Sequence, residues 1–136
     1  MSWLKDVIGT EKAVIAMCHM QAMPGDPAYD ADKGMEWVTE QTLADLNGLQ
    51  EGGVDAVMFS NEFSLPHLTS VEPVTVACMA RVTRQLYDEI TIPVGVTVLG
   101  DAARTQYVAA CSCAASARAK FTGAYGSGLG LRCATW

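Results

Sequence analysis

Short, mainly apolar runs recur along the first part of the chain. They occupy residues 13–18, 54–59 and 94–99 and are separated by polar or Gly- and Pro-containing segments. A mainly apolar run of this length is typical of a strand that is buried on both faces. The starts of the three runs lie 41 and then 40 residues apart. This pattern predicts three strands of a parallel sheet.

Between the apolar runs, hydrophobic residues recur at spacings of three and four, which predicts amphipathic helices. The first such stretch covers about residues 33–50 and stops at Gly52-Gly53. The second begins near Pro73, a residue suited to the first turn of a helix. A short helix capped by Ser2 is expected before Gly9. The expected core positions of the two longer helices are Met35, Val38, Thr42, Leu46, Leu49, Val74, Cys78, Met79, Val82 and Leu86.

The resulting order is strand, helix, strand, helix, strand, which indicates an α/β fold with helices covering a parallel sheet. The segments that follow a predicted strand are about 10–15 residues long, whereas those that follow a helix are short. Long loops at the carboxyl ends of strands carry the chemistry of α/β proteins. A flavodoxin-like open sheet also fits this order and remains an alternative.

The pattern changes after Leu99. Residues 101–120 contain eight alanines and only one branched aliphatic residue, Val108. Alanine propensity permits a helix near residues 102–119, but such a helix would bury little apolar area. We therefore divide the chain into two parts. Residues 1–99 form three strand–helix units, and residues 100–136 form an atypical tail rich in Ala and Gly.

Charge changes at the same place. The chain has a net charge of −6, which argues against nucleic acid or an anionic membrane as the main partner. Residues 1–99 carry fourteen acids and five bases, whereas residues 100–136 carry one acid and four bases. No signal peptide or membrane-spanning segment is predicted. Five cysteines without the spacing of a disulfide framework favour the cytoplasm.

Polar residues follow the first two predicted strands directly. His19 and Gln21 come after the first, and Asn61 and Glu62 come after the second. A histidine or carboxylate at such a strand end can act as a general acid or base. The alternatives are a histidine packed under its loop, and an Asn61-Glu62 pair that ties its loop to backbone amides. We assign His19 and Glu62 as candidate catalytic residues, and Gln21 and Asn61 as candidate ligand-binding residues.

Two more residues lie at the margin of the expected site. Thr97 belongs to the third strand and Asp101 follows it. Both are candidate ligand-binding residues, although a helix cap is the preferred interpretation of Asp101. No metal site is assigned, because the Cys111-Ser-Cys113 pair lacks a partner pair at zinc spacing. The glycine-rich segment 126–130 lacks the lysine of a phosphate-binding loop, so we assign no such loop. The cofactor is unknown.

Three stretches together resemble the BtpA/SgcQ family, with the enterobacterial SgcQ type most similar. They are residues 1–19 together with residues 24–27, residues 52–64 (GGVDAVMFSNEFS), which are the most specific, and residues 92–96 (IPVGV). The resemblance implies part of a TIM-like (β/α)₈ barrel of the ribulose-phosphate-binding type. It also implies binding or turnover of a small, phosphorylated, sugar-like ligand. Because one branch is associated with photosystem I, a non-enzymatic assembly or stability factor is the alternative.

The chain departs from the family pattern at Thr97, where the family usually has Asn, and across most of the segment after Leu99. The stretch 121–125 (FTGAY) resembles the family again. We therefore hypothesise a reading frame that is lost after Leu99, regained near Phe121 and lost again before the end of the chain. Resequencing the gene tests this hypothesis.

A complete barrel needs about 250 residues, so we expect this chain to supply about half of one. An open half barrel leaves a strand edge and apolar surface uncovered, which predicts self-association. Barrels of this type often hold phosphate in loops after strands seven and eight. We therefore expect the 136 residues to be catalytically inactive.

Overall fold

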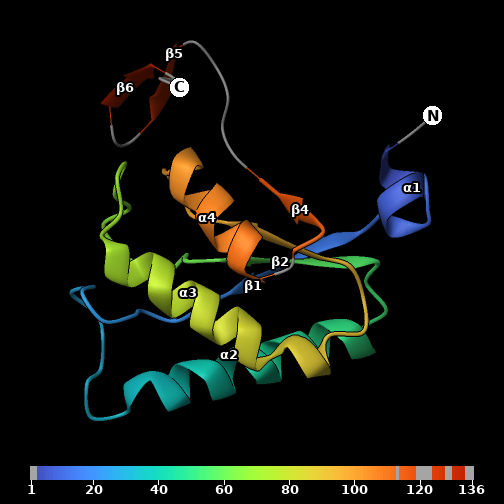
Figure 1. The fold of residues 1–136 in the computed structure, drawn as a ribbon, viewed down its shortest axis with the longest axis horizontal. Coiled ribbons are helices and arrows are strands. Elements are labelled where there is room, and N and C mark those ends of the chain that lie inside the picture. The colour runs from blue at the N-terminus through green and yellow to red at the C-terminus, as the bar shows by residue number, and fades with distance from the viewer. Residues whose placement is uncertain (1–2, 113, 119–123, 128–129, 134–136) are drawn as a thin grey trace.

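The sheet expected from the apolar runs is present, with one strand more than predicted. A computed structural model describes residues 3–112, 114–118, 124–127 and 130–133. Four parallel strands form a sheet in the order β1-β2-β3-β4 (Figure 1). Their bounds are β1 (Ile15–His19), β2 (Ala56–Ser60), β3 (Val94–Thr97) and β4 (Ser116–Ala117).

Three helices cover one face of this sheet. Helix α2 packs against β1 and α3, α3 packs against α4, and α4 packs against β3. Figure 1 shows α4, α3 and α2 as neighbouring helices, with α2 at the bottom of the view. The helices are α2 (Gly34–Glu51), α3 (Pro73–Gln85) and α4 (Ala102–Ser112), with α1 (Trp3–Ile8) before the sheet and a short 3₁₀ helix, η1 (Tyr87–Glu89), after α3.

The two sides of each strand face different surroundings. In β2, Val57 and Phe59 join the apolar core together with residues of α2 and α3. Met58 and Ser60 alternate with them and so point to the opposite side of the sheet. Every residue of β2 is buried, as expected for a central strand of a helix-covered parallel sheet.

The strand order excludes the flavodoxin-like alternative. In that fold the first strand lies between the second and third strands, whereas here β2 lies between β1 and β3. Each new strand is added beside the preceding one, and the helices share one face. This is the arrangement of the first part of a (β/α)₈ barrel, and the fold expected from the sequence is confirmed.

The core positions expected in α2 and α3 are largely confirmed. Helix α2 buries Met35, Val38, Thr42 and Leu46. Helix α3 has Pro73 in its first turn, as expected, and buries Cys78, Met79 and Val82. Val74 is an exception, because 37% of it is exposed. Thr75 and Thr83 are buried in this helix instead, and Thr83 Oγ1 donates a hydrogen bond to the Met79 carbonyl at 2.8 Å.

The helix that alanine propensity permitted near residues 102–119 is present as α4 (Ala102–Ser112), and the tail adds a strand that the apolar pattern did not indicate. Helix α4 packs on α3 and β3, and Val108 and Thr105 are fully buried. Strand β4 pairs with β3 through Gly95 and Ser116. A Cβ atom at Gly95 would lie 2.5 Å from Ser116 Oγ, so this glycine permits the close approach of β4. Small residues therefore form the fourth strand, in a segment without a Val-, Ile- or Leu-rich run.

Further along, β5 (Ala124–Ser127) and β6 (Gly130–Cys133) form an antiparallel hairpin. This hairpin contains part of the glycine-rich stretch 126–130. Residues 128–129 of that stretch, Cys113 and residues 121–123 lie outside the described part of the chain.

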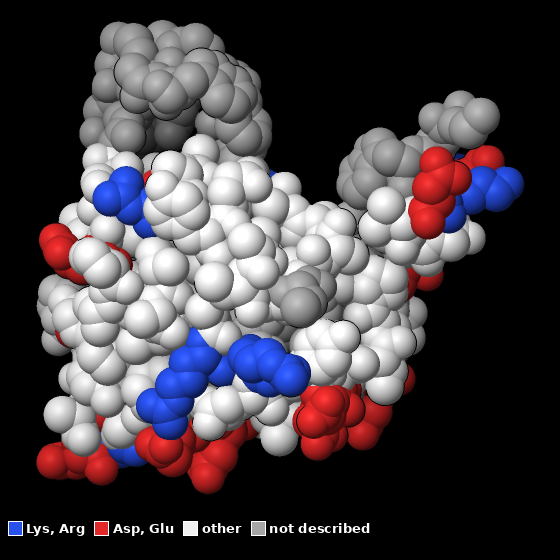
Figure 2. Space-filling view, in the orientation of Figure 1, with Lys and Arg blue, Asp and Glu red and all other residues white. Residues whose placement is uncertain are grey.

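Acidic side chains are unevenly distributed over the face shown in Figure 2. They gather along the edge occupied by α2, whereas the middle of the face, over α3 and α4, carries few charged side chains. One ion pair joins α2 to α3, between Arg81 Nη2 and Glu36 Oε1 at 2.6 Å. Both side chains are largely exposed, so this pair contributes little to stability.

Candidate functional site

The carboxyl ends of the first three strands bring three polar residues into one row. His19 of β1 pairs in register with Ser60 of β2, and Ser60 pairs with Thr97 of β3. Laterally paired residues of a parallel sheet point to the same face. The three side chains therefore lie on the face opposite to the helices, at the sheet end where α/β enzymes place their chemistry.

His19 is the centre of the polar contacts in this row. Its Nδ1 atom lies 2.8 Å from Ser60 Oγ and 4.0 Å from Glu62 Oε2. The His19 and Glu62 side chains are 37% and 44% exposed, so both can meet a ligand from solvent. The structure thus brings together the two residues that the sequence assigned as catalytic.

The Phe63 ring stands beside this pair. The ring centroids of His19 and Phe63 are 6.3 Å apart and the ring planes meet at 83°, an edge-to-face arrangement of the kind that aromatic rings favour. Phe63 is 43% exposed. It therefore helps to orient the imidazole while one side of the phenyl ring stays accessible.

Ser60 is a site residue that the sequence analysis missed. It is fully buried, and its hydroxyl positions the His19 ring by the 2.8 Å contact. The sequence does show that Ser60 is a hydroxyl-bearing residue at the end of an apolar run. Its contact with His19 could be predicted only from the register of β1 and β2, because residues 19 and 60 are far apart in the sequence.

Asn61 occupies a different position from the one expected. It is 1% exposed, and its Oδ1 atom accepts a hydrogen bond from the Leu99 N–H at 2.7 Å. This contact ties the end of β2 to the segment after β3. The alternative interpretation, a loop tied to backbone amides, therefore describes Asn61, whereas Glu62 faces His19.

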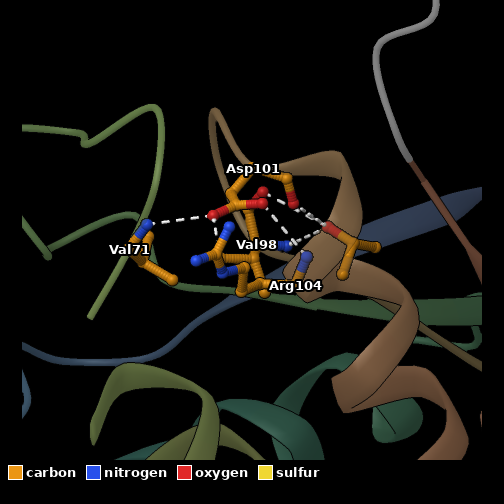
Figure 3. Close-up of polar contacts among 5 residues, drawn as sticks. Val71, Val98, Asp101 and Arg104 are labelled. Atoms are coloured by element: carbon orange, nitrogen blue, oxygen red, sulfur yellow. Dashed lines mark hydrogen bonds and ion pairs between the residues drawn. The ribbon is translucent and has the colours of Figure 1, made fainter. Parts of the chain in front are cut away.

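Asp101 caps helix α4 and also holds a loop in place (Figure 3). Its Oδ1 atom accepts the Arg104 N–H at 3.0 Å, and its Oδ2 atom accepts the Val71 N–H at 2.9 Å. Arg104 Nε lies 3.4 Å from Oδ2. The carboxylate is 3% exposed and both oxygens are engaged. The preferred interpretation from the sequence, a helix cap, agrees with this geometry.

Thr105 completes the network around Asp101. Its Oγ1 atom accepts the Val98 N–H at 2.9 Å and lies 2.9 Å from the Asp101 carbonyl oxygen, to which it donates. The end of β3 is thereby fixed to the first turn of α4. Together with Asn61, this network sets the position of the β3 end, including Thr97.

Gln21 lines a pocket of about 290 Å³. The other lining residues come from the loop after β1, the start of α2 and the loop after β2, which contributes Phe63. Phe63 therefore borders both His19 and the pocket. Among the predicted residues, His19 and Glu62 thus approach each other, Gln21 lines a neighbouring pocket, and Asn61 and Asp101 are buried anchors.

The thiol next to this site is not suited to nucleophilic chemistry. Burial, together with the charge of Asp45, raises the pKa of Cys18 from 9.0 to about 12. A thiol with so high a pKa carries almost no thiolate near neutral pH. Within the described residues, no group of three His, Cys, Asp or Glu side chains is arranged to hold a metal ion.

Comparison with known proteins assigns the chain to a family. The sequence profile of the BtpA family matches residues 10–132. The chain belongs to the BtpA family. The match extends well past Leu99 and includes α4, β4 and most of the described hairpin, so the family signal continues into the atypical tail.

The relatives differ in what their names state. The chain is 59% identical over 131 residues to the putative sgc region protein SgcQ of Escherichia coli (strain K12), which covers 96% of this chain and 49% of SgcQ. It is 36% identical over 110 residues to an uncharacterised protein of Thermococcus kodakarensis, covering 81% of this chain and 40% of that protein. The photosystem I biogenesis protein BtpA of Synechocystis sp. is 28% identical over 104 residues, or 75% of this chain and 36% of that protein.

The chain thus spans about half the length of SgcQ. No solved structure matches the chain significantly. Among the helices of the described residues, none combines the length and the apolar character that crossing a membrane requires.

Proposed function

We propose that the carboxyl ends of β1, β2 and β3 bind a small hydroxylated, sugar-like ligand. The observation that carries the proposal is the His19–Glu62 pair, whose Nδ1 and Oε2 atoms are 4.0 Å apart at the open end of the sheet. A carboxylate accepts hydrogen bonds from sugar hydroxyls, and an imidazole exchanges protons near neutral pH.

In this proposal the residues have distinct roles. Glu62 binds a ligand hydroxyl, His19 gives or takes a proton, and Ser60 positions the His19 ring through Nδ1. Thr97 contributes a hydroxyl at the far side of the row. Asn61 and Asp101 act at the margin of the site as anchors of the strand end.

For the 136 residues alone we propose binding without turnover. Barrels of this type often hold a phosphate group in loops after strands seven and eight, and the chain spans about half of SgcQ. Turnover of a phosphorylated ligand by this chain, abolished in Glu62→Gln, would contradict the proposal.

Thermal-shift measurements test the site. Phosphosugars, neutral sugars and divalent ions are screened against this chain and against E. coli SgcQ. A ligand present at 100 times its Kd stabilises the folded state by about 2.7 kcal/mol. We expect at least one sugar to raise the Tm, and Glu62→Gln or His19→Asn to reduce the shift.

The control is Glu72→Gln, which changes an exposed carboxylate beside the start of α3. It should keep the full shift. The proposal fails if no sugar in the panel raises the Tm of either protein, or if Glu62→Gln and Glu72→Gln respond alike.

A second candidate function is the assembly or stabilisation of another protein. The observation that favours it is the similarity to a photosystem I biogenesis protein. Gene neighbourhood separates the two candidates. Sugar-transport genes beside this gene favour the ligand-binding function, and photosynthesis genes favour the assembly function.

A further inference from the structure

The pocket beside Phe63 has walls of two chemical kinds. Its apolar walls include the rings of Tyr29, Trp37 and Phe63, and its polar walls include Gln21, Asp30 and Lys33. The volume of about 290 Å³ lies at the lower end of the range for small-molecule sites. The pocket is therefore of a size for one ring with a few polar substituents.

The two loops that form the pocket are joined before any ligand arrives. Asp26 Oδ2 accepts a hydrogen bond from the Met23 N–H and another from the Ser64 hydroxyl, both at 2.7 Å. Met23 and Asp26 belong to the loop after β1, and Ser64 belongs to the loop after β2. Walls that are already fixed reduce the entropy that binding costs.

The charges around the pocket disfavour an anionic occupant. Lys33 Nζ lies 3.5 Å from Asp30 Oδ2 and 4.4 Å from the centroid of the Trp37 ring. Lys33 is the only cation among the described residues that line the pocket. It is already paired with a carboxylate and an aromatic face. Asp26, Asp32 and Glu36 lie on the same segment of sequence and add negative charge.

A neutral ring fits these walls when it has an apolar face for the aromatic side chains and hydrogen-bonding groups at its edge. A pyranose ring has both, because its C–H groups form an apolar face and its hydroxyls project from the rim. Gln21 and Asp30 supply acceptors and Gln21 and Lys33 supply donors for those hydroxyls. A purely aromatic ligand would leave the polar walls unpaired.

We propose that this pocket binds a neutral carbohydrate ring adjacent to the His19–Glu62 pair. Phe63 is the shared wall, since it lines the pocket and stands 6.3 Å from the His19 ring. This proposal rests on the proposed function, because it takes the sugar unit at His19 and Glu62 as the neighbour of the ring in the pocket. One sugar unit meets His19 and Glu62, and the next ring stacks in the pocket, so the ligand class is a glycoside or disaccharide.

Paired titrations with glucose and the disaccharides maltose, cellobiose and lactose test the inference on the 136-residue chain. Indole fluorescence reports on the pocket through Trp37, and Trp37→Phe identifies that signal among the three tryptophans. A single small ring supports a Kd on the order of 1 mM. We expect at least one disaccharide to bind about tenfold more tightly than glucose, since the second ring adds contacts.

Matched variants assign the gain to the pocket. Tyr29→Ala removes an aromatic wall of the pocket and should abolish the tenfold gain of the disaccharide over glucose. Tyr107→Ala removes a tyrosine that is 59% exposed on α4 and should keep the gain. Equal affinities for glucose and all three disaccharides in the unaltered chain overturn the inference, as does a gain that survives Tyr29→Ala.

Glu62→Gln separates this inference from the proposed function. If the Trp37 signal with a disaccharide persists in Glu62→Gln while no Glu62-dependent thermal shift exists, the pocket inference stands and the proposed function fails. If the Glu62-dependent shift exists without a Trp37 signal, the pocket inference alone fails. Absence of both signals overturns both.

Discussion

At the scale of single residues, a side chain's role here follows from what it contacts more than from its type. Glu62 and Asn61 are neighbours in sequence, yet Glu62 faces His19 and Asn61 is buried against the Leu99 N–H. Both residues follow the end of β2 (Ala56–Ser60), and their side chains meet different surroundings. One residue of the pair is thereby free for a ligand and the other anchors the strand.

Cys18 provides a prediction on pH dependence. Its pKa is raised to about 12 in the folded chain from 9.0, so the unfolded chain loses this proton first as the pH rises. The free energy of unfolding should therefore fall between pH 9 and 12, by up to about 1.4 kcal/mol per pH unit. Below pH 9 the thiol is protonated in both states and contributes no slope.

Urea unfolding at pH 8, 9.5 and 10.5 measures this dependence, with Cys18→Ala as the comparison. The variant lacks the titrating thiol and should lose stability less steeply with pH. The burial of Cys78 raises its pKa too, so Cys78 adds a slope that both proteins share. If the free energy of unfolding depends on pH in the same way for the unaltered chain and for Cys18→Ala, the pKa of Cys18 is the same in the folded and unfolded states and the prediction is wrong.

At the scale of elements, polar contacts attach the ends of helices and strands to one another. Gln50, near the end of α2, is one example, because its Oε1 atom accepts the Thr91 N–H at 2.7 Å and its Nε2 atom donates to the Glu89 carbonyl. Asp101 is another and links α4 to the loop that precedes α3. Such contacts fix where each strand ends and therefore where the site lies.

Asp101→Ala should destabilise the chain by about 1–3 kcal/mol. The substitution removes a helix cap and leaves the buried Val71 N–H without its acceptor. Chemical unfolding measures the loss. Asp101→Asn retains an acceptor oxygen and should cost less, so equal losses for the two variants, or no loss for Asp101→Ala, would contradict the assigned role.

At the scale of the whole molecule, the sheet has two edges, β1 and β4. The start of β1 is exposed and apolar, with Val14 61% and Ile15 39% exposed. An exposed apolar edge strand is a template for pairing with another chain. The surface geometry therefore supports the self-association expected from the sequence, which stays a prediction.

Size-exclusion chromatography with light scattering tests self-association. We expect the apparent mass to rise with concentration, because pairing at the β1 edge is intermolecular. Val14→Lys places a charge at that edge and should shift the distribution toward the monomer, whereas Val74→Lys on α3 serves as the matched control. A monodisperse species of 14.5 kDa at all concentrations would contradict this expectation.

The interrupted reading frame also remains a prediction, and resequencing decides it. The family match to residue 132 shows that the tail retains family character overall. The packing of α4 on α3 and the pairing of β4 with β3 occur in the part of the tail where the apolar pattern is weakest.

The sequence by itself determined the elements and their order. Apolar runs and 3.6-residue periodicity are local signals, and they located β1, β2, β3, α2 and α3 closely. They also located the end of the sheet that carries His19 and Glu62. Strand β4 escaped prediction because its two residues, Ser116 and Ala117, are accommodated by Gly95 across the sheet, and a local pattern contains no information on such a partner.

Only the tertiary structure decided which polar residues meet. The strand order excluded the flavodoxin-like alternative, and the register placed Ser60 against His19. The same packing buried Asn61 and Asp101 and opened the pocket around Gln21 and Trp37. These outcomes depend on contacts between residues about 40 positions apart, which are fixed when the strands align and the helices pack on one face of the sheet.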